Sequence, residues 1–256
     1  MQRTVPAHHK PFPELVERQP KSTPYSIIDT NGKTWLPTNG MASLVERKLL
    51  VPLLAEARCV ARHELAHVKW SPIRLPKVAY DLRYLMAVED ARINLGLRFI
   101  GIPVELGEAE RAQVGRLAAQ DLDERDLLGF VLRAVAAQGT NAEECVLAAL
   151  AVRASAVRDL AFRHVRHVRI ELLRARRVRR KPVACFRVVR RLAAELARDL
   201  EQELPRLGYS AAFPWSLSLS GAGCCLGHGR DERGPKGGKA ADKGGKPAEK
   251  AAEKKE

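Results

Sequence analysis

The sequence predicts a mainly α-helical protein with a small N-terminal β-hairpin and a disordered C-terminal tail. Helix start signals, helix stop signals and apolar residues at three- and four-residue spacing recur from Ser43 to about residue 204. Two short β-prone runs flank Asn31-Gly32, a pair that favours a two-residue hairpin turn. From about Gly208 the chain is rich in Ser, Gly, Lys and Glu, which bury too little apolar surface to become ordered.

Prolines and capping signals divide the N-terminal part of the chain. Five prolines indicate an extended lead-in over the first 24 residues, and the hairpin is expected within residues 25–36. Ser43-x-x-Glu46 has the form of a capping box, so a helix is expected to begin near Ser43. Pro52 interrupts it, and a second helix is expected from Leu53 to Trp70.

Helices continue through the middle of the chain. Asp81 is the expected N-cap of a third helix that ends near Arg98. Further helices are expected near 106–119, 122–137, 141–178, which could be broken, and 183–204. The organisation is therefore an extended lead-in (1–24), a metal-binding domain (25–104), a helical region with a basic stripe (105–207) and a low-complexity tail (208–256).

Composition narrows the class of protein. The 256 residues are 46% apolar, which suffices for a hydrophobic core. The longest charge-free stretch, residues 207–229, is broken by glycines and a proline, so no membrane span is expected. No secretory signal is recognisable, and five cysteines do not suggest a disulfide framework. An intracellular, cytoplasmic protein with reduced thiols is expected.

Residues 63–67 read His-Glu-Leu-Ala-His, an H-E-x-x-H motif within a predicted helix. In a helix the i, i+4 spacing puts His63 and His67 on one face, where both imidazoles can bind one Zn²⁺. Glu64 then lies beside the ion, where it can take a proton from a zinc-activated water and return it to a leaving amine. The motif predicts a zinc metallopeptidase acting on peptides or proteins. The alternatives are two surface histidines, or a metal site that is structural or inactive.

Glu89 is the expected third metal ligand, because a catalytic zinc usually has three protein ligands. It follows His67 by twenty-two residues, on a helix beyond a proline-marked turn that lets it fold back. A carboxylate among apolar neighbours needs a partner, which a metal would supply. Asp90 could hydrogen-bond a ligating histidine and fix its tautomer. Two alternatives stay open: an ion pair between Glu89 and Arg92, and Asp90 as the ligand.

The HELAH motif and the VEDARIN segment at residues 88–94 together resemble zincin metallopeptidases with a glutamate third ligand. They are more closely similar to the metallopeptidase-like domain that precedes von Willebrand A-like domains in bacterial and phage proteins. The resemblance covers residues 43–98 and implies a zincin-like fold. It implies His63, His67 and Glu89 as metal ligands and Glu64 as the general base. No von Willebrand A-like domain is recognisable after it, so no function of that domain is implied.

A basic segment supports a second function class. Between Arg153 and Arg191, thirteen arginines and Lys181 face only two acidic residues, so most of the formal net charge of +14 lies here. A non-catalytic zincin-like protein could bind nucleic acid non-specifically, or a protein partner, through these helices. The arginines of the stripe are Arg163, Arg166, Arg169, Arg174, Arg177 and Arg180. The alternative is a surface helix whose arginines pair with acids such as Asp121, Asp123 and Glu124.

Other reactive side chains have subsidiary interpretations. Cys59 is expected to be a small buried apolar residue. Tyr80 or Tyr84 could supply a phenol to the tetrahedral intermediate. The remaining candidates are a solvated basic face containing His164 and His167, and a second metal group formed by Cys224, Cys225 and His228.

Overall fold

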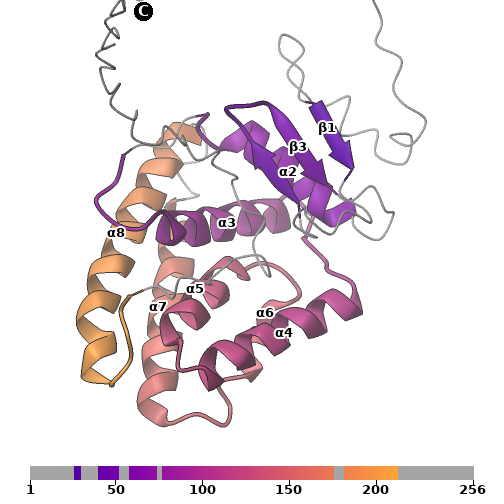
Figure 1. The fold of residues 1–256 in the computed structure, drawn as a ribbon. Helices are drawn as coiled ribbons and strands as arrows, with labels where there is room; N and C mark the ends of the chain where they lie inside the picture. The colour runs from indigo at the N-terminus through magenta and orange to yellow at the C-terminus, as the bar shows by residue number, and fades with distance from the viewer. Residues whose placement is uncertain (1–25, 30–39, 52–57, 74–76, 176–181, 213–256) are drawn as a thin grey trace, which may run out of the picture.

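The computed structural model describes residues 26–29, 40–51, 58–73, 77–175 and 182–212 (Figure 1). These residues form a three-stranded sheet followed by seven helices, so the mainly helical prediction is confirmed. No helix within the described ranges is long and apolar enough to cross a membrane. The predicted lead-in (1–24) and the tail beyond residue 212 lie outside these ranges.

The described strands form one sheet that contains the first strand of the predicted hairpin. Strands β1 (Ser26–Asp29), β2 (Met41–Ser43) and β3 (Lys48–Val51) lie in the order β1-β3-β2. β1 pairs with β3 in parallel, and β2 pairs with β3 antiparallel. The first predicted strand therefore exists, but it pairs with β3; the Asn31-Gly32 turn lies outside the described residues. The hairpin of this structure is β2–β3.

The helix predicted to begin at Ser43 is wrong. Ser43 ends β2, and the Ser43 hydroxyl accepts a hydrogen bond from the Glu46 N–H at 3.4 Å within the tight β2–β3 turn. Such a side-chain bond can close a turn as well as cap a helix, so it did not discriminate between them. Arg47 completes the turn with a φ of 55°. Leu49 and Val51 are fully buried in the sheet.

Helix α2 (Arg58–Trp70) carries the H-E-x-x-H motif and packs between the sheet and α3 (Leu82–Phe99). Leu65 and Ala61 of α2 join the sheet residues in one apolar cluster. Ala66 packs with Ile93 and Leu97 of α3 in a second cluster. Burial on both sides fixes the rotation of α2, so the histidine face is directed toward α3. Residues 53–57 of the predicted second helix lie outside the described ranges.

Helix α3 begins as predicted, because the Asp81 carboxylate accepts the Arg83 N–H at 2.8 Å. Its buried residues join the main core with α5 (Leu127–Ala136), α7 (Ser155–Ala175) and α8 (Pro182–Arg206). The core of the predicted helical region therefore includes a helix of the predicted metal-binding domain. Figure 1 shows α3 between α2 with the sheet on one side and α4, α5 and α6 on the other.

Helix α5 is the centre of the helical core, since every one of its residues is buried. It contacts α3, α7, α4 (Glu108–Asp123) and α6 (Glu143–Ala148). The predicted helix over 141–178 is broken into α6 and α7. The one charged residue of α5, Arg133, makes two hydrogen bonds to Asp121 of α4, at 2.7 and 3.1 Å.

Candidate metal centre

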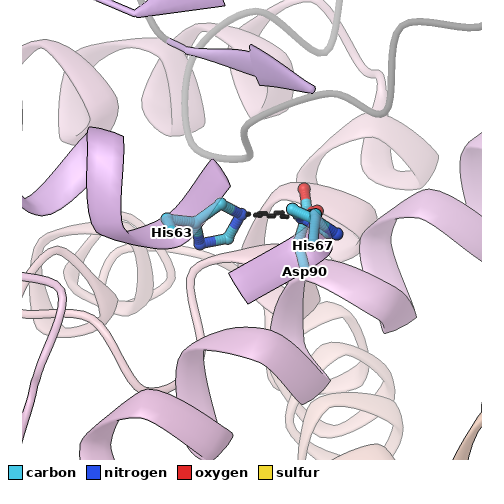
Figure 2. Close-up of side chains that lie close together, drawn as sticks. All are labelled: His63, His67 and Asp90. Atoms are coloured by element: carbon cyan, nitrogen blue, oxygen red, sulfur yellow. Dashed lines mark hydrogen bonds and ion pairs between the residues drawn. The ribbon is translucent and has the colours of Figure 1, made fainter. Parts of the chain in front are cut away.

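Two histidines of α2 and one aspartate of α3 converge on one point (Figure 2). The Nε2 atoms of His63 and His67 lie 2.9 Å apart. Oδ1 of Asp90 lies 3.2 Å from Nε2 of His67 and 3.8 Å from Nε2 of His63. The site is enclosed, because none of the three residues is more than 3% exposed.

Asn94, one turn after Asp90, fixes the orientation of His63. Its side-chain NH₂ donates to the carbonyl of Ala136 at 2.9 Å, so its oxygen faces His63 Nδ1 at 2.7 Å. An amide oxygen only accepts hydrogen bonds, and His63 must therefore carry its proton on Nδ1. This leaves a lone pair on the Nε2 of His63.

Ser71 fixes the orientation of His67 in the same way. The Ser71 hydroxyl donates to Glu89 Oε1 at 2.5 Å, and it lies 3.0 Å from Nδ1 of His67. Burial would raise the pKa of Glu89, but the Arg92 guanidinium holds that pKa below its usual range, so the carboxylate is an acceptor. Because the Ser71 hydroxyl donates its hydrogen bond to Glu89, the Ser71 oxygen must accept the hydrogen bond from His67 Nδ1–H. The Nε2 of His67 also keeps a lone pair.

The centre is therefore a meeting of three hydrogen-bond acceptors: two imidazole lone pairs and a carboxylate oxygen. Within the described part of the chain, no donor reaches Oδ1 of Asp90 with hydrogen-bond geometry. Acceptors that face one another without water repel, unless a cation lies between them. A proton shared by the two histidines would place its charge beside Asp90, whereas a metal ion could bind all three groups directly.

The two histidines hold a proton unequally. Burial alone would lower the pKa of His63, but the Asp90 and Glu64 carboxylates raise it above the ordinary histidine value. Burial lowers the pKa of His67, and the charge of His63 adds to this effect, with Asp90 opposing it. His63 is therefore the more basic of the two histidines.

The donor set fits a small divalent cation. Tetrahedral zinc holds nitrogen and oxygen ligands about 2.0–2.2 Å away, which places neighbouring ligand atoms about 3.3–3.6 Å apart. The separations of 2.9, 3.2 and 3.8 Å bracket this range. Two imidazoles and one carboxylate are also ligands typical of zinc sites that keep a position for water.

Glu89 differs from its predicted place. Both of its oxygens are occupied: Arg92 donates to Oε2 at 2.7 Å and to Oε1 at 2.5 Å, and Ser71 also donates to Oε1. In this structure Glu89 therefore forms the ion pair with Arg92 that the sequence left as an alternative. Asp90, assigned by sequence to orient a histidine, has the position facing both Nε2 atoms.

Glu64, the predicted general base, is fully buried beside the histidines. Gly40, just before β2, comes close to it: a Cβ added to Gly40 would lie 2.9 Å from Oε1 of Glu64 and 2.6 Å from Val60. A glycine is thus the residue that fits above the Glu64 carboxylate. The charge of Glu64 is close enough to raise the pKa of His63.

Sequence reasoning did not identify Asn94 and Ser71. Each lies four residues from a member of the centre, Asn94 from Asp90 and Ser71 from His67. That spacing puts residues on one helical face and was the available signal. It is also a common spacing, so it gains meaning only once the centre is known.

The remaining sequence candidates have structural contacts away from this centre. Tyr80 donates to the carbonyl of Arg190 on α8 at 3.1 Å, and Tyr84 is buried in the main core. Cys59, expected to be buried, is half-buried and packs beside the α2–α3 cluster. His164 was expected on a solvated face, but it is 5% exposed and bonded to Glu203 at 2.9 Å. Cys224, Cys225 and His228 lie outside the described residues.

Most of the described arginines of the basic stripe pair with acidic side chains. Three of its arginines form ion pairs, namely Arg163 with Glu203, Arg169 with Glu143 and Arg174 with Glu171. Arg166 is exposed, and Arg177 and Arg180 lie outside the described residues. Of the acidic partners that the sequence suggested, Asp123 pairs with Arg153 and Asp121 with Arg133. These pairs favour the structural interpretation of the stripe.

Comparison of the chain with known proteins gives no further indication, since no family model, curated protein or solved structure matches it.

Proposed function

We propose that the protein is a zinc metallopeptidase whose ion is held by His63, His67 and Asp90. The proposal rests on the convergence of His63, His67 and Asp90, all three buried, with Nδ1 of each histidine already hydrogen-bonded to Asn94 or Ser71. The assignment replaces Glu89 by Asp90 as third ligand, because Arg92 and Ser71 occupy both oxygens of Glu89. The resemblance of HELAH and VEDARIN to zincins supports the same class of enzyme.

Each residue then has a defined task. His63 and His67 present Nε2 to the ion, and Asp90 adds the negative charge that a divalent cation requires. A bound zinc would lower the pKa of water and polarise a substrate carbonyl. Glu64 would accept a proton from the attacking water and pass it to the leaving amine, so that the peptide bond is cleaved without a free strong base.

Hydrolysis with a matched base variant tests this function. The full chain is stripped with chelator, reloaded with one equivalent of Zn²⁺ and incubated with a peptide library, and cleavage is followed by mass spectrometry. Glu64→Gln should keep the zinc, since Glu64 is not a ligand, and lose about 10²- to 10⁴-fold in rate. The double variant His63→Ala/His67→Ala should lose both zinc and cleavage.

Two results would contradict the proposal. Wild-type protein that takes up no zinc would remove the metal centre. Zinc-loaded protein that cleaves nothing in the library, or a Glu64→Gln variant with full activity, would remove the peptidase. Salt-dependent binding to nucleic acid that is unchanged in Glu64→Gln would then favour the non-catalytic alternative.

A further inference from the structure

A chain of hydrogen bonds extends from His67 away from the metal centre. His67 Nδ1–H reaches Ser71 at 3.0 Å, and Ser71 donates to Glu89 at 2.5 Å. Arg92 holds Glu89 from the other side and donates to the carbonyl of Trp70 at 3.0 Å. The chain begins and ends on the last turn of α2, with α3 supplying the two charged members.

The hydrogen bonds that orient His63 are of a different kind. There the acceptor is the neutral amide of Asn94, which is anchored to a backbone carbonyl. On the His67 side, the Ser71 hydroxyl donates a hydrogen bond to the Glu89 carboxylate. This hydrogen bond makes the Ser71 oxygen a stronger acceptor for His67. A stronger acceptor at Nδ1 makes the other ring nitrogen a better metal ligand.

Arg92 fixes the geometry of the His67–Ser71–Glu89 hydrogen-bond chain. The guanidinium donates to both oxygens of Glu89 and to the Trp70 carbonyl, one of the carbonyls at the end of α2 that has no partner within the helix. The Trp70 ring lies against Gly96 of α3, where an added Cβ would be 3.2 Å from it. The end of α2, and with it Ser71, is thereby held against α3.

We propose that Ser71, Glu89 and Arg92 are positioning residues that hold His67 as its Nδ1–H tautomer, with Nε2 directed at the metal. Glu89 thus acts on the ion through Ser71 and His67 and does not bind it. This inference rests on the proposed zinc centre for its effect on metal affinity. Its effect on the histidine tautomer exists in the metal-free protein as well.

The tautomer can be measured without metal or activity. Long-range ¹H–¹⁵N NMR of the metal-free full chain distinguishes protonation at Nδ1 from protonation at Nε2 for each histidine. In wild type, His67 should be protonated at Nδ1. In Ser71→Ala it should shift to a mixture of tautomers, and Ser71→Thr, which keeps the hydroxyl, should restore the wild-type signal.

Zinc affinity gives the second readout, by competition with a chromophoric chelator. Ser71→Ala and Glu89→Gln should each weaken zinc binding by about 10- to 100-fold, as loss of a contact behind a ligand does. Glu203→Gln is the matched control, because Glu203 also bonds an arginine and a buried histidine, Arg163 and His164. It should leave the affinity and the His67 signal unchanged.

The outcomes separate this inference from the proposed function. An unchanged His67 tautomer in both Ser71→Ala and Glu89→Gln would overturn it, whatever the protein binds. Complete loss of zinc in Glu89→Gln with full affinity in Ser71→Ala would also overturn it, because Glu89 would then be a ligand. Absence of zinc in the wild-type protein would contradict the proposed function. A tautomer shift in Ser71→Ala would still support the positioning role of Ser71, Glu89 and Arg92.

Discussion

At the scale of single residues, adjacent carboxylates on α3 have opposite tasks. Glu89 and Asp90 are both buried, so burial could not decide between them. Their partners distinguish them. Arg92 lies three residues after Glu89, close enough to form an ion pair with its carboxylate, whereas Asp90 faces the histidines across the α2–α3 contact. The sequence contained both interpretations, and the choice depends on the rotation of α3 against α2, which is a tertiary property.

Asp90→Asn should therefore impair the metal centre strongly. The amide keeps the shape but removes the negative charge and presents a weaker ligand. Zinc affinity should fall by more than the roughly 10- to 100-fold expected for contacts behind a ligand, and more than in Glu89→Gln. Equilibrium dialysis of both variants against zinc measures this order. The reverse order would show that Glu89 is the third ligand.

Gly40→Ala tests the close approach of the backbone to Glu64. The added methyl would collide with Val60 and with the Glu64 side chain, so one of the two must move. Overpacking of this kind costs about 1–3 kcal/mol in the free energy of unfolding. Urea denaturation measures this loss, and a stability equal to that of wild type would show that the backbone at Gly40 does not approach Glu64 as closely as described.

At the scale of helices, the Asp121–Arg133 pair joins α4 to the buried α5. Asp121→Ala would leave the Arg133 guanidinium in the core without its partner, which costs about 3–5 kcal/mol in unfolding free energy. Glu124→Ala, next to the pair but exposed, is the control and should cost less than about 1 kcal/mol. Equal small losses in chemical denaturation would mean that the pair contributes little to α4–α5 packing.

Glu171 gives the α7–α8 contact a pH dependence. Hydrogen bonds from Arg191, and then from Arg174, hold the pKa of Glu171 below its usual range. Its contribution to stability is thus present above the unfolded-state pKa and is lost as the pH falls through the folded-state value. Glu171→Gln should lower Tm at pH 7, and the difference should vanish well below about pH 4.3. A difference independent of pH would contradict this assignment.

Local sequence signals predicted the helices better than they predicted the pairing of the strands. The Asp81 cap, the proline stop after Trp70 and the helical periodicity are short-range features, and α3 begins where they indicate. Ser43-x-x-Glu46 was misleading because the same side-chain bond closes the β2–β3 turn. The pairing of β1 with β3 joins residues more than twenty positions apart, and no local pattern specifies it.

At the scale of the whole molecule, the charge excess and the metal centre lie in different parts of the fold. The described arginines of the stripe, Arg163, Arg166, Arg169 and Arg174, are on α7, and three of them pair with Glu203, Glu143 and Glu171. The centre lies between α2 and α3, and α3 joins it to the main core. The composition revealed the charge excess, but the ion pairs that three of these arginines form depend on helix packing.

The most direct measurement is X-ray absorption at the zinc edge of the zinc-loaded full chain. A zinc ion on His63, His67 and Asp90 should show nitrogen and oxygen ligands at about 2.0–2.2 Å, the multiple-scattering pattern of two imidazoles and no sulfur. The imidazole pattern should disappear in His63→Ala/His67→Ala. A sulfur shell at about 2.3 Å would place the ion on cysteines, such as Cys224 and Cys225, and would contradict a centre made of His63, His67 and Asp90.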